Sequence, residues 1–162
     1  MIKNTTSVLG YRGRFAPSPT GKLHFGSLIA AVGSYLDAKS HGGKWLIRIE
    51  DLDKPREVPG SSYKILKSLE ALGMEWDHEV IYQDQRKDIY ESVLTMLNKR
   101  KLIYPCTCTR KEISNSSIAG ISGQIYAGTC RNNIQEDGYF GAVRIKTNSN
   151  IIEFKDTLHG LI

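Results

Sequence analysis

The sequence has few cysteines and no long apolar run. Only three of the 162 residues are cysteine, all between Cys106 and Cys130, and this odd, local set argues against the disulfide framework of a small secreted domain. The longest uncharged apolar run, from about Leu28 to Leu36, is too short to cross a bilayer and lies well inside the chain. We therefore expect a cytoplasmic protein without a signal peptide or a membrane partner.

The composition is that of a globular domain with an excess of positive charge. Apolar residues make up 40% of the chain and charged residues 24%, which excludes an intrinsically disordered chain. The net charge of +5 suits a polyanionic partner such as nucleic acid. The basic runs at 99–101 and 110–111 are of a kind more often found on solvated surfaces, so charge alone leaves nucleic-acid binding open.

Apolar spacing predicts alternating strands and helices in the first part of the chain. Strands are expected at 11–16, 45–49 and 80–82, and helices around the apolar residues of 28–36, 61–72 and 89–97. Gly42 and Gly73 mark the ends of the first two helices, and Ser61 is the expected N-cap of the second. Strand, helix and strand form a βαβ unit, which favours an α/β fold with a parallel sheet.

The second part of the chain lacks this periodicity. From Tyr104 to about Asp137 it is rich in cysteine, threonine, serine, glycine and asparagine, and we expect it to be irregular. Short strands are expected after it, at 141–146 and 151–154. This segment therefore reads as an insertion on the first part.

The segment from Arg14 to Gly26 is a candidate phosphate-binding loop. A strand opens there into a turn of prolines and glycine that ends at a helix N-terminus, where free amides and the helix dipole favour an anion. Gly26 would allow close backbone approach, and His24 can donate a hydrogen bond to charge that develops during phosphoryl chemistry. The alternative is an ordinary turn, because such turns before helices are common and a single histidine is more often a packed or surface residue.

The same segment resembles the first signature of the class I aminoacyl-tRNA synthetases in its glutamate-specific form, with His24–Ser27 at the His-x-Gly-x core. Leu46–Asp53 is similar to the Arg-Ile-Glu-Asp-x-Asp segment of that family. The resemblance implies the first half of a doubly wound, Rossmann-like parallel sheet with a zinc-binding insertion. We accordingly expect a loose segment at 1–10, a nucleotide-binding Rossmann half at 11–103, and the zinc-loop insertion with its following short strands at 104–162.

The resemblance also implies roles for individual residues. ATP would be bound by Pro19, Thr20, Gly21, His24, Gly26 and Ser27, glutamate by Arg14, Phe15, Ala16, Pro17, Ser18 and Glu50, with His24 and Gly26 as the catalytic pair. Arg14 offers a planar donor fork that suits a carboxylate, and Glu50 an anion for an ammonium group. Taken alone, Glu50 and its charged neighbours Arg48, Asp51 and Asp53 read as surface charges that cap a strand, and we assign those three neighbours to support.

Two segments favour one branch of this family. Gly26–Ala31 and Pro55–Gly60 resemble the enzymes that transfer glutamate to queuosine in the anticodon loop of tRNA(Asp). This implies ATP-dependent formation of glutamyl adenylate with Mg²⁺, transfer to that tRNA, and a monomeric enzyme. Ordinary glutamyl-tRNA synthetases usually carry another glycine and an Arg-Thr pair after the histidine, and a fragment of such an enzyme is the alternative.

The three cysteines and one tyrosine form a candidate metal site. Cys106 and Cys108 form a Cys-x-Cys pair. Seventeen residues then separate Cys108 from Tyr126, and Cys130 follows four residues after Tyr126. Thiolates suit zinc, and a nearby cation lowers a phenol pKa from about 10, although reduced cysteines packed around Tyr126 would give the same pattern. The resemblance implies a zinc site at Cys106, Cys108, Tyr126 and Cys130, structural because protein fills all four positions. The loop from Arg110 to Ile125 is longer than usual, which is compatible with loss of the metal.

The family's sheet has a second half with further glutamate ligands and a Lys-Met-Ser-Lys-Ser-type loop, and neither is found in this sequence. We expect those elements beyond Ile162. Because a nucleotide crevice of this kind is built from both halves, a noncatalytic module that binds nucleotide or tRNA is a further alternative.

Overall fold

The computed structural model describes residues 10–120, 123–132, 141–148, 150–156 and 159–162. The chain divides into two compact units, Met1–Ile89 and Tyr90–Ile162. Their boundary falls within helix α3 (Lys87–Lys99), whereas the sequence suggests a change of character after residue 103. Apart from Gly10, the segment expected to be loose lies outside the described residues.

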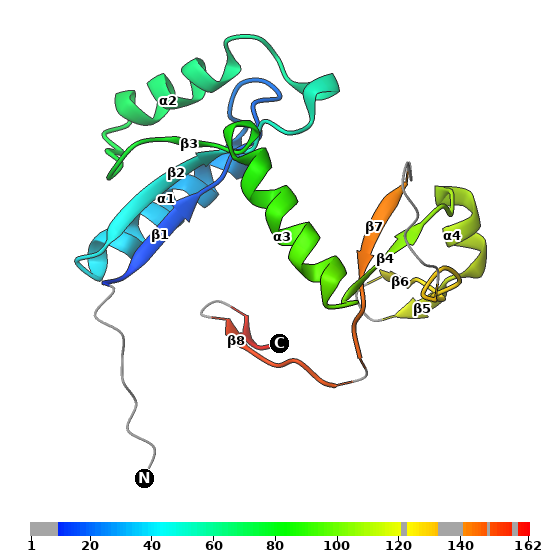
Figure 1. The fold of residues 1–162 in the computed structure, drawn as a ribbon. Coiled ribbons are helices and arrows are strands. Elements are labelled where there is room, and N and C mark those ends of the chain that lie inside the picture. The colour runs from blue at the N-terminus through cyan, green and yellow to red at the C-terminus, as the bar shows by residue number, and fades with distance from the viewer. Residues whose placement is uncertain (1–9, 121–122, 133–140, 149, 157–158) are drawn as a thin grey trace. The chain divides into compact units, whose positions relative to one another are not determined.

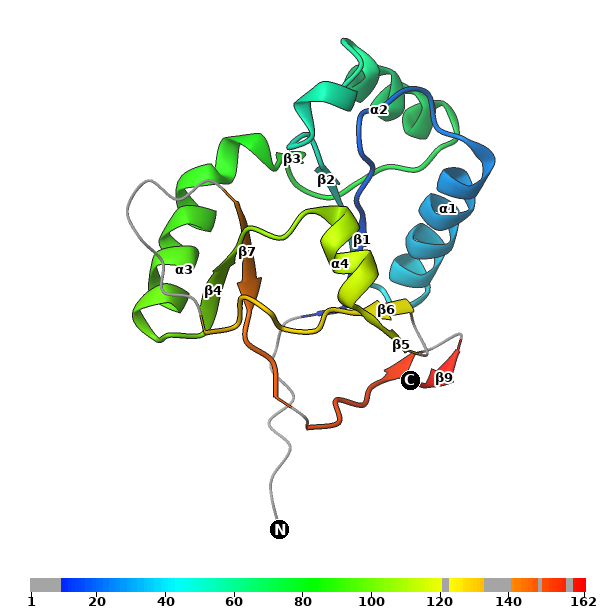
Figure 2. The same ribbon diagram turned by 90° about the vertical axis from the view of Figure 1, so that its right-hand side faces the viewer.

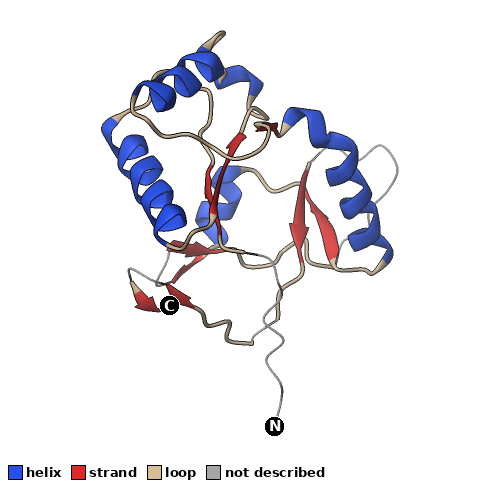
Figure 3. Ribbon diagram, turned by 90° about the vertical axis from the view of Figure 1, so that its left-hand side faces the viewer, coloured by secondary structure: helices blue, strands red, loops and turns tan. Residues whose placement is uncertain are grey.

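The first unit is built on a small parallel sheet. Its elements are β1 (Arg12–Phe15), α1 (Phe25–Ser40), β2 (Lys44–Ile49), the 3₁₀ turn η1 (Lys54–Arg56), α2 (Ser61–Ala71), β3 (Ile81–Tyr82) and the 3₁₀ turn η2 (Asp84–Arg86). The three strands are parallel in the order β1-β2-β3 (Figure 1). The predicted βαβ unit and the predicted strand at 80–82 are therefore confirmed, and Figure 3 shows the alternation of strands and helices.

One face of this sheet carries the hydrophobic core. Strand β2 alternates, so that Trp45, Ile47 and Ile49 are buried while the residues between them are partly exposed. Trp45 stacks on Phe15 with ring centroids 6.2 Å apart, meets the ring of Tyr35 edge-on at 5.2 Å, and donates its indole hydrogen bond to Ser34. Aromatic pairs in these geometries add to the area that they bury. Trp45 is therefore the centre of the packing between the sheet and α1.

Close packing of α1 depends on a glycine in β1. A Cβ at Gly13 would lie 2.9 Å from both the Cβ of Ala38 and the carbonyl oxygen of Ser34, so no larger residue fits without moving the helix. Helix α2 joins the same core through Ile65 and Leu69. Right-handed crossovers in the order β1-β2-β3 place α1 and α2 on the same face of the sheet.

The other face of this sheet is lined by Arg12, Arg14, Leu46 and Arg48, which the register places side by side. A doubly wound sheet needs helices on both faces, and within the described part of this unit α1 and α2 cover only one. The structure thus bears out the α/β class and the parallel sheet, while the second layer of helices stays an expectation.

The expected N-cap of α2 is wrong. Ser61 is the first residue of the helix, and the residue before it is Gly60, at φ +74°. The Ser61 side chain is buried, and its Oγ accepts a hydrogen bond from the amide of Gly21 at 3.0 Å and donates to the carbonyl of the same residue. A serine hydroxyl can hydrogen-bond either to the backbone of its own helix or to a neighbouring segment. Here it bonds to the neighbouring loop, at Gly21.

The second unit contains short antiparallel pairs. Strand β4 (Ile103–Cys106) pairs with β7 (Ala142–Ile145), β5 (Ile118–Gly120) with β6 (Gly123–Ile125), and β8 (Lys155–Asp156) with β9 (Gly160–Leu161). Helix α4 (Arg110–Ser116) and the part of α3 from Tyr90 onward belong to the same unit. Figure 2 shows β4 beside β7. Among the described residues, no helix combines the length and the apolar character needed to cross a membrane.

Two expectations for this unit need correction. The segment after Tyr104 is not wholly irregular, because α4 begins after a capping box in which Thr109 and Glu112 bond to each other's backbone amides at 3.2 and 2.7 Å. The strand at 141–146 is confirmed as β7, whereas the one expected at 151–154 is wrong. Only Phe154 of that stretch has a cross-strand partner, exchanging two backbone hydrogen bonds with Ile162, and the assigned strand starts at Lys155.

Candidate functional site

The loop between β1 and α1, residues 16–24, is fixed by backbone contacts at three points. The carbonyl of Pro17 accepts from the amide of Glu50 at 3.0 Å, and that of Pro19 accepts from Val58 at 2.9 Å. The third point is the pair of bonds between Ser61 and Gly21. The loop is thereby tied to the carboxyl end of β2 and to the start of α2.

The contact between Ser61 and Gly21 gives a testable expectation. Ser61→Ala leaves two partly buried backbone groups of Gly21 without their partner, so we expect a loss of about 1–3 kcal/mol in the free energy of unfolding. Both tryptophans, Trp45 and Trp76, belong to the first unit, and urea unfolding followed by tryptophan fluorescence therefore reports on this unit. Ser62→Ala, one residue further along the same helix, is the matched control, and equal stability of the two variants would contradict the expectation.

A pocket of about 410 Å³ opens between this loop and the start of α1. Its lining consists of Phe15, Ala16, Pro17, Ser18, Thr20, Gly21, Lys22, Leu23, His24, Gly26, Ser27, Ala30 and Ile65. The first turn of α1 contains no acidic residue, so the positive end of the helix dipole is not neutralised there. The amides of Phe25 and Gly26 have no acceptor within the helix. The pocket is therefore suited to an anionic group.

His24 is the N-cap of α1. Its Nδ1 accepts from the amide of Ser27 at 3.2 Å, and its Nε2 lies 3.1 Å from the hydroxyl of the same residue. If Nδ1 accepts, the proton of the neutral ring is on Nε2, and that nitrogen is the donor toward Ser27 or toward a ligand in the pocket. A Cβ at Gly26 would lie 3.1–3.2 Å from the His24 ring, so glycine leaves room for the ring at this position.

The structure brings most of the predicted binding residues to this one pocket. Of the residues assigned to ATP, Thr20, Gly21, His24, Gly26 and Ser27 line it, and of those assigned to glutamate, Phe15, Ala16, Pro17 and Ser18 do. Their division between the two ligands stays a prediction. Lys22, Leu23, Ala30 and Ile65 complete the lining and were not among the predicted ligands. Lys22 stands within the recognised segment, whereas Ile65 of α2 reaches the pocket only through the tertiary fold.

Three predicted residues do not line the pocket. Arg14 is exposed on the face of β1 opposite the core, and Pro19, within the loop, is fully buried. Glu50 follows β2, and its Oε1 accepts from Arg48 at 2.6 Å. This pair lies at the carboxyl end of the strand, which is the edge where ligands of parallel α/β sheets bind. The roles of Arg14, Pro19 and Glu50 toward ligands stay predictions.

The acidic residues after β2 hold the following turns. Asp51 is buried, and its Oδ1 accepts from the amide of Asp84 at 2.9 Å. Asp53 pairs with Arg56 at 2.6 Å. The pKa of Asp84 lies below its usual range because Lys87 and Lys54 donate to its carboxylate. These contacts give Asp51 and Asp53 structural partners, in keeping with their assignment to support.

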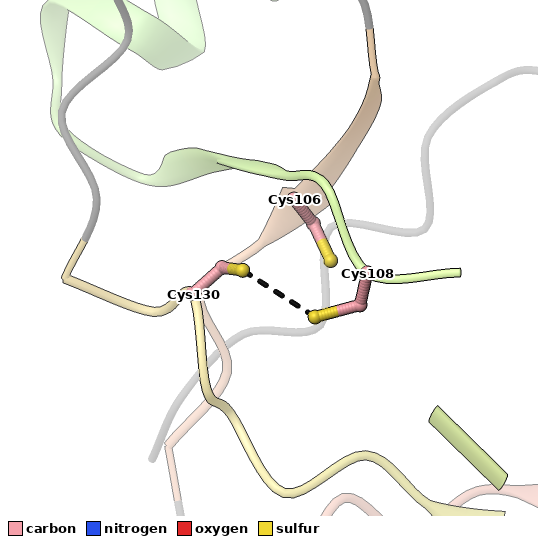
Figure 4. A group of neighbouring side chains, drawn as sticks. All are labelled: Cys106, Cys108 and Cys130. Atoms are coloured by element: carbon pink, nitrogen blue, oxygen red, sulfur yellow. Dashed lines mark hydrogen bonds between the residues drawn. The ribbon is translucent and has the colours of Figure 1, made fainter. Parts of the chain in front are cut away.

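The second unit gathers the three cysteines around one tyrosine. Figure 4 shows Cys106 and Cys108 on one segment and Cys130 on another, with the three side chains directed toward one another. The three sulfurs lie within 4.8 Å of one another, and those of Cys108 and Cys130 are 3.5 Å apart. The Tyr126 hydroxyl is 3.4 Å from the sulfurs of both Cys106 and Cys108. The long loop carries α4 and the β5–β6 pair, and it still returns Tyr126 to the cysteines.

The electrostatics of this cluster favour a thiolate at Cys106. Burial raises the pKa of its thiol, but the interactions with Tyr126 and Arg144 outweigh burial and lower that pKa to about 6. The bond from Tyr126 also lowers the pKa of Cys130. The bond with Tyr126 also acts to lower the pKa of Cys108. The neighbouring sulfurs of Cys130 and Cys106 have the larger combined effect, so the pKa of Cys108 is raised. The hydrogen bonds with the sulfurs of Cys106 and Cys108 raise the pKa of Tyr126, and its hydroxyl oxygen also accepts from the backbone amide of Cys130 at 3.0 Å.

The distances that join Tyr126 to Cys106 and Cys108, and Cys108 to Cys130, are close to those of a zinc site. With Zn–S about 2.3 Å and Zn–O about 2.0 Å, a tetrahedral ion holds sulfur and oxygen roughly 3.5 Å apart and two sulfurs roughly 3.8 Å apart. The observed distances of 3.4 Å and 3.5 Å are close to both values. Three soft ligands and one oxygen in this arrangement fit zinc better than the oxygen-preferring Mg²⁺ or Ca²⁺.

The chain is similar to known proteins over most of its length. Residues 11–162 match the family described as tRNA synthetases class I (E and Q), catalytic domain. The chain is 51% identical over 150 residues to the glutamyl-Q tRNA(Asp) synthetase of Chromobacterium violaceum, covering 93% of this chain and 50% of the relative. The corresponding enzyme of Neisseria meningitidis serogroup B is 52% identical over 153 residues, covering 93% of this chain and 52% of the relative.

Solved structures of glutamate-tRNA ligases are also similar. The enzyme of Elizabethkingia meningosepticum, determined in complex with its amino acid, superposes with a TM-score of 0.71 at 28% identity, over 94% of this chain and 36% of that one. The glutamate-tRNA synthetase of Elizabethkingia anophelis gives a TM-score of 0.72 at 28% identity, over the same shares of the two chains. This chain spans about half the length of the curated relatives that it matches. Since the match extends over nearly all of its residues, the chain belongs to the class I tRNA synthetases of the glutamyl and glutaminyl group, within their catalytic domain.

Proposed function

We propose that this chain supplies the ATP- and glutamate-binding part of an enzyme that activates glutamate and transfers it to queuosine in the anticodon loop of tRNA(Asp). The observation that carries the proposal is the pocket of about 410 Å³ at the start of α1. Its lining comes largely from the segment that resembles the family's first signature. A tRNA substrate would place the reaction in the cytoplasm.

The first step of the proposed reaction joins glutamate to AMP. A carboxylate oxygen of glutamate attacks the α-phosphorus of ATP, a new P–O bond forms, and pyrophosphate leaves with the electrons of the broken bond. The free amides at the start of α1 and the Nε2–H of His24 would face the phosphates and stabilise their growing charge. Mg²⁺, which this family uses with ATP, would neutralise phosphate charge. Ser18 and Ala16 would border the glutamate.

The positions of Arg48 and Glu50 bear on the amino-acid end of the site. In the proposed complex, Glu50 would pair with the ammonium group of glutamate, and Arg48 would hold the carboxylate in place at 2.6 Å. Arg14 would meet the glutamate side chain from the sheet face that α1 and α2 leave uncovered. This assignment rests on the resemblance and on the position of the three residues at one sheet edge.

We further propose that Cys106, Cys108, Tyr126 and Cys130 hold a structural zinc ion. The four side chains converge with suitable spacing, and no ligand position would remain open for a reacting water. The ion would connect β4 to the segment that follows the long loop. It would thereby brace the second unit rather than take part in the chemistry.

An ordinary glutamyl-tRNA synthetase is the second candidate. The similarity to solved glutamate-tRNA ligases favours it, because those structures match over 94% of this chain. Identity to them is 28%, however, against 51% and 52% for relatives named as glutamyl-Q enzymes. Charging assays separate the candidates, since the first predicts glutamate attached to the modified anticodon nucleoside and the second predicts attachment at the 3′ end of the tRNA.

The test of activation is glutamate-dependent ATP–pyrophosphate exchange without tRNA. We expect exchange by the unaltered chain and a decrease of about 10²–10³-fold in His24→Ala, the usual effect of removing one donor that stabilises developing charge. His41→Ala is the matched control, because His41 caps the opposite end of the same helix and is exposed there. Its exchange rate should equal that of the unaltered chain.

The outcomes of this assay separate three claims. Unchanged exchange in His24→Ala would contradict the role of His24 alone. No exchange by the unaltered, folded chain would contradict autonomous activation by this part of the enzyme. ATP binding, measured by calorimetry on the same chain, then tests the pocket itself, and a lack of binding would contradict the nucleotide site.

A further inference from the structure

Arg144 lies against the candidate metal site from a neighbouring strand. It belongs to β7, where the register sets it opposite Tyr104 of β4, and Cys106 ends β4 two residues later. The guanidinium carbon is 4.1 Å from the centroid of the Tyr126 ring. The Arg144 guanidinium also lowers the pKa of the Cys106 thiol. One cation thus lies against the Tyr126 ring and acts on Cys106, which are two of the four proposed ligands.

Arg144 has no acidic partner within the part of the chain that the structure describes. The ion pairs of the described residues do not include it, and its buried Nε has no hydrogen-bond partner among them. A partly buried cation normally has an anion beside it, because the loss of hydration is otherwise uncompensated. Among the described residues, its neighbours at the site are the Tyr126 ring and Cys106, whose thiol has its pKa lowered to about 6.

The charge of the proposed metal site explains this placement. Three thiolates and one phenolate bring four negative charges against the two positive charges of zinc, so the loaded site has two negative charges in excess. Such an excess at a partly buried position is unfavourable unless a cation lies close by. The guanidinium is a suitable group because it is planar and weakly hydrated, and can stack on an aromatic ring while donating hydrogen bonds at its edge.

We propose that Arg144 is a positioning residue of the metal site, which offsets its excess negative charge and holds Cys106 and Tyr126 in the geometry needed for zinc. This inference rests on the zinc site proposed above. It adds a residue from β7 to a centre whose ligands come from β4 and the segments at Tyr126 and Cys130. It also gives the pairing of β4 with β7 a functional consequence, because a shift of register would remove the cation from the site.

The test is the affinity of the chain for zinc, measured by competition with a chromophoric chelator. Arg144→Gln keeps hydrogen-bonding groups but removes the charge, and we expect it to weaken zinc binding about 10–100-fold, as is usual for residues that support metal ligands. Arg144→Lys keeps the charge without the planar fork. Its affinity for zinc should be less than about tenfold weaker than that of the unaltered chain. Lys146→Met removes a positive charge close by on the same chain segment, and should bind zinc as the unaltered chain does.

Cobalt spectra provide a second readout. Co²⁺ bound in a tetrahedral site of thiolates gives intense visible bands, and the affinity for Co²⁺ should fall in the same order among the variants. If Arg144→Gln is unfolded without metal, its affinity is read from the zinc concentration at half-refolding, since binding and folding are then coupled. Failure of the unaltered chain to bind zinc or cobalt would contradict the metal site itself. Binding by the unaltered chain with no loss in Arg144→Gln, or with an equal loss in Arg144→Lys, would overturn the role of the Arg144 charge.

Discussion

Removal of zinc is expected to unfold the second unit while the first unit stays folded. In the described part of this unit, the cluster of buried residues consists of Tyr104, Cys106 and Cys130, with Cys108 and Tyr126 packed against it. The residues of this core are therefore largely the proposed metal ligands. Zinc binding contributes about 10–16 kcal/mol to the folding of small zinc-dependent peptides, more than this small cluster can supply by packing.

Backbone amide exchange measures this effect for each unit separately. With a strong chelator, or in Cys130→Ser, protection should be lost for the amides of β4 and β7, whereas the fluorescence of Trp45 and Trp76 should not change. Thr107→Ala is the matched control, because Thr107 stands between two of the proposed ligands and contacts Cys130 through its backbone. Protection of β4 and β7 that survives the chelator would contradict a stabilising metal.

Replacing Trp45 by alanine is expected to give the largest loss of stability in the first unit. The side chain is fully buried, and it contacts Phe15 and Tyr35 and donates to Ser34. Truncation of a buried tryptophan typically costs about 3–5 kcal/mol, and the lost hydrogen bond adds to the cost. Because domains are usually stable by only about 5–15 kcal/mol, a large part of the stability of this unit should disappear.

Urea unfolding of Trp45→Ala, followed by the fluorescence of Trp76, gives the free energy directly. Trp45→Phe is the matched control, since it keeps a ring against Phe15 and Tyr35 but cannot donate to Ser34. We expect its loss to be clearly smaller than that of alanine. A loss below about 1 kcal/mol for Trp45→Ala would contradict the central place of this residue in the core.

Much of the first unit could be predicted because its signals are local. The apolar residues of β2 and of α1 recur at the spacing of a strand and of a helix, so the βαβ unit is legible without tertiary information. Ser61 was misassigned for the opposite reason. Its hydroxyl bonds to Gly21, forty residues earlier. A contact between residues so far apart cannot be predicted from the residues next to Ser61 in the sequence.

Apolar spacing does not predict helix α4, because the helix has no apolar face. Ile113 is the single apolar residue among its seven, although Thr109 and Glu112 stand at the spacing of a capping box. The capping box alone, without any apolar periodicity, indicates a helix that begins after Thr109.

The candidate sites follow the same division. The loop pocket was predictable because nearly all of its lining comes from one continuous segment, and the cysteines and Tyr126 because their chemistry is distinctive. Ile65 and Arg144 reach these sites from other elements, and their types suggest no role by themselves. Only the fold shows which core residue and which of many basic residues are involved.

The contact of Gly13 with one end of α1 affects the position of the other end of that helix. Gly13 packs against the later half of the helix, at Ser34 and Ala38, while the pocket lies at the other end, beside His24 and Gly26. A helix of 16 residues is a stiff rod about 24 Å long, so a side chain that pushed its C-terminal end away from β1 would tilt the N-terminal end that borders the pocket. The position of the free amides at the start of α1 is thus set in part by the lack of a side chain at Gly13, near the opposite end of the helix.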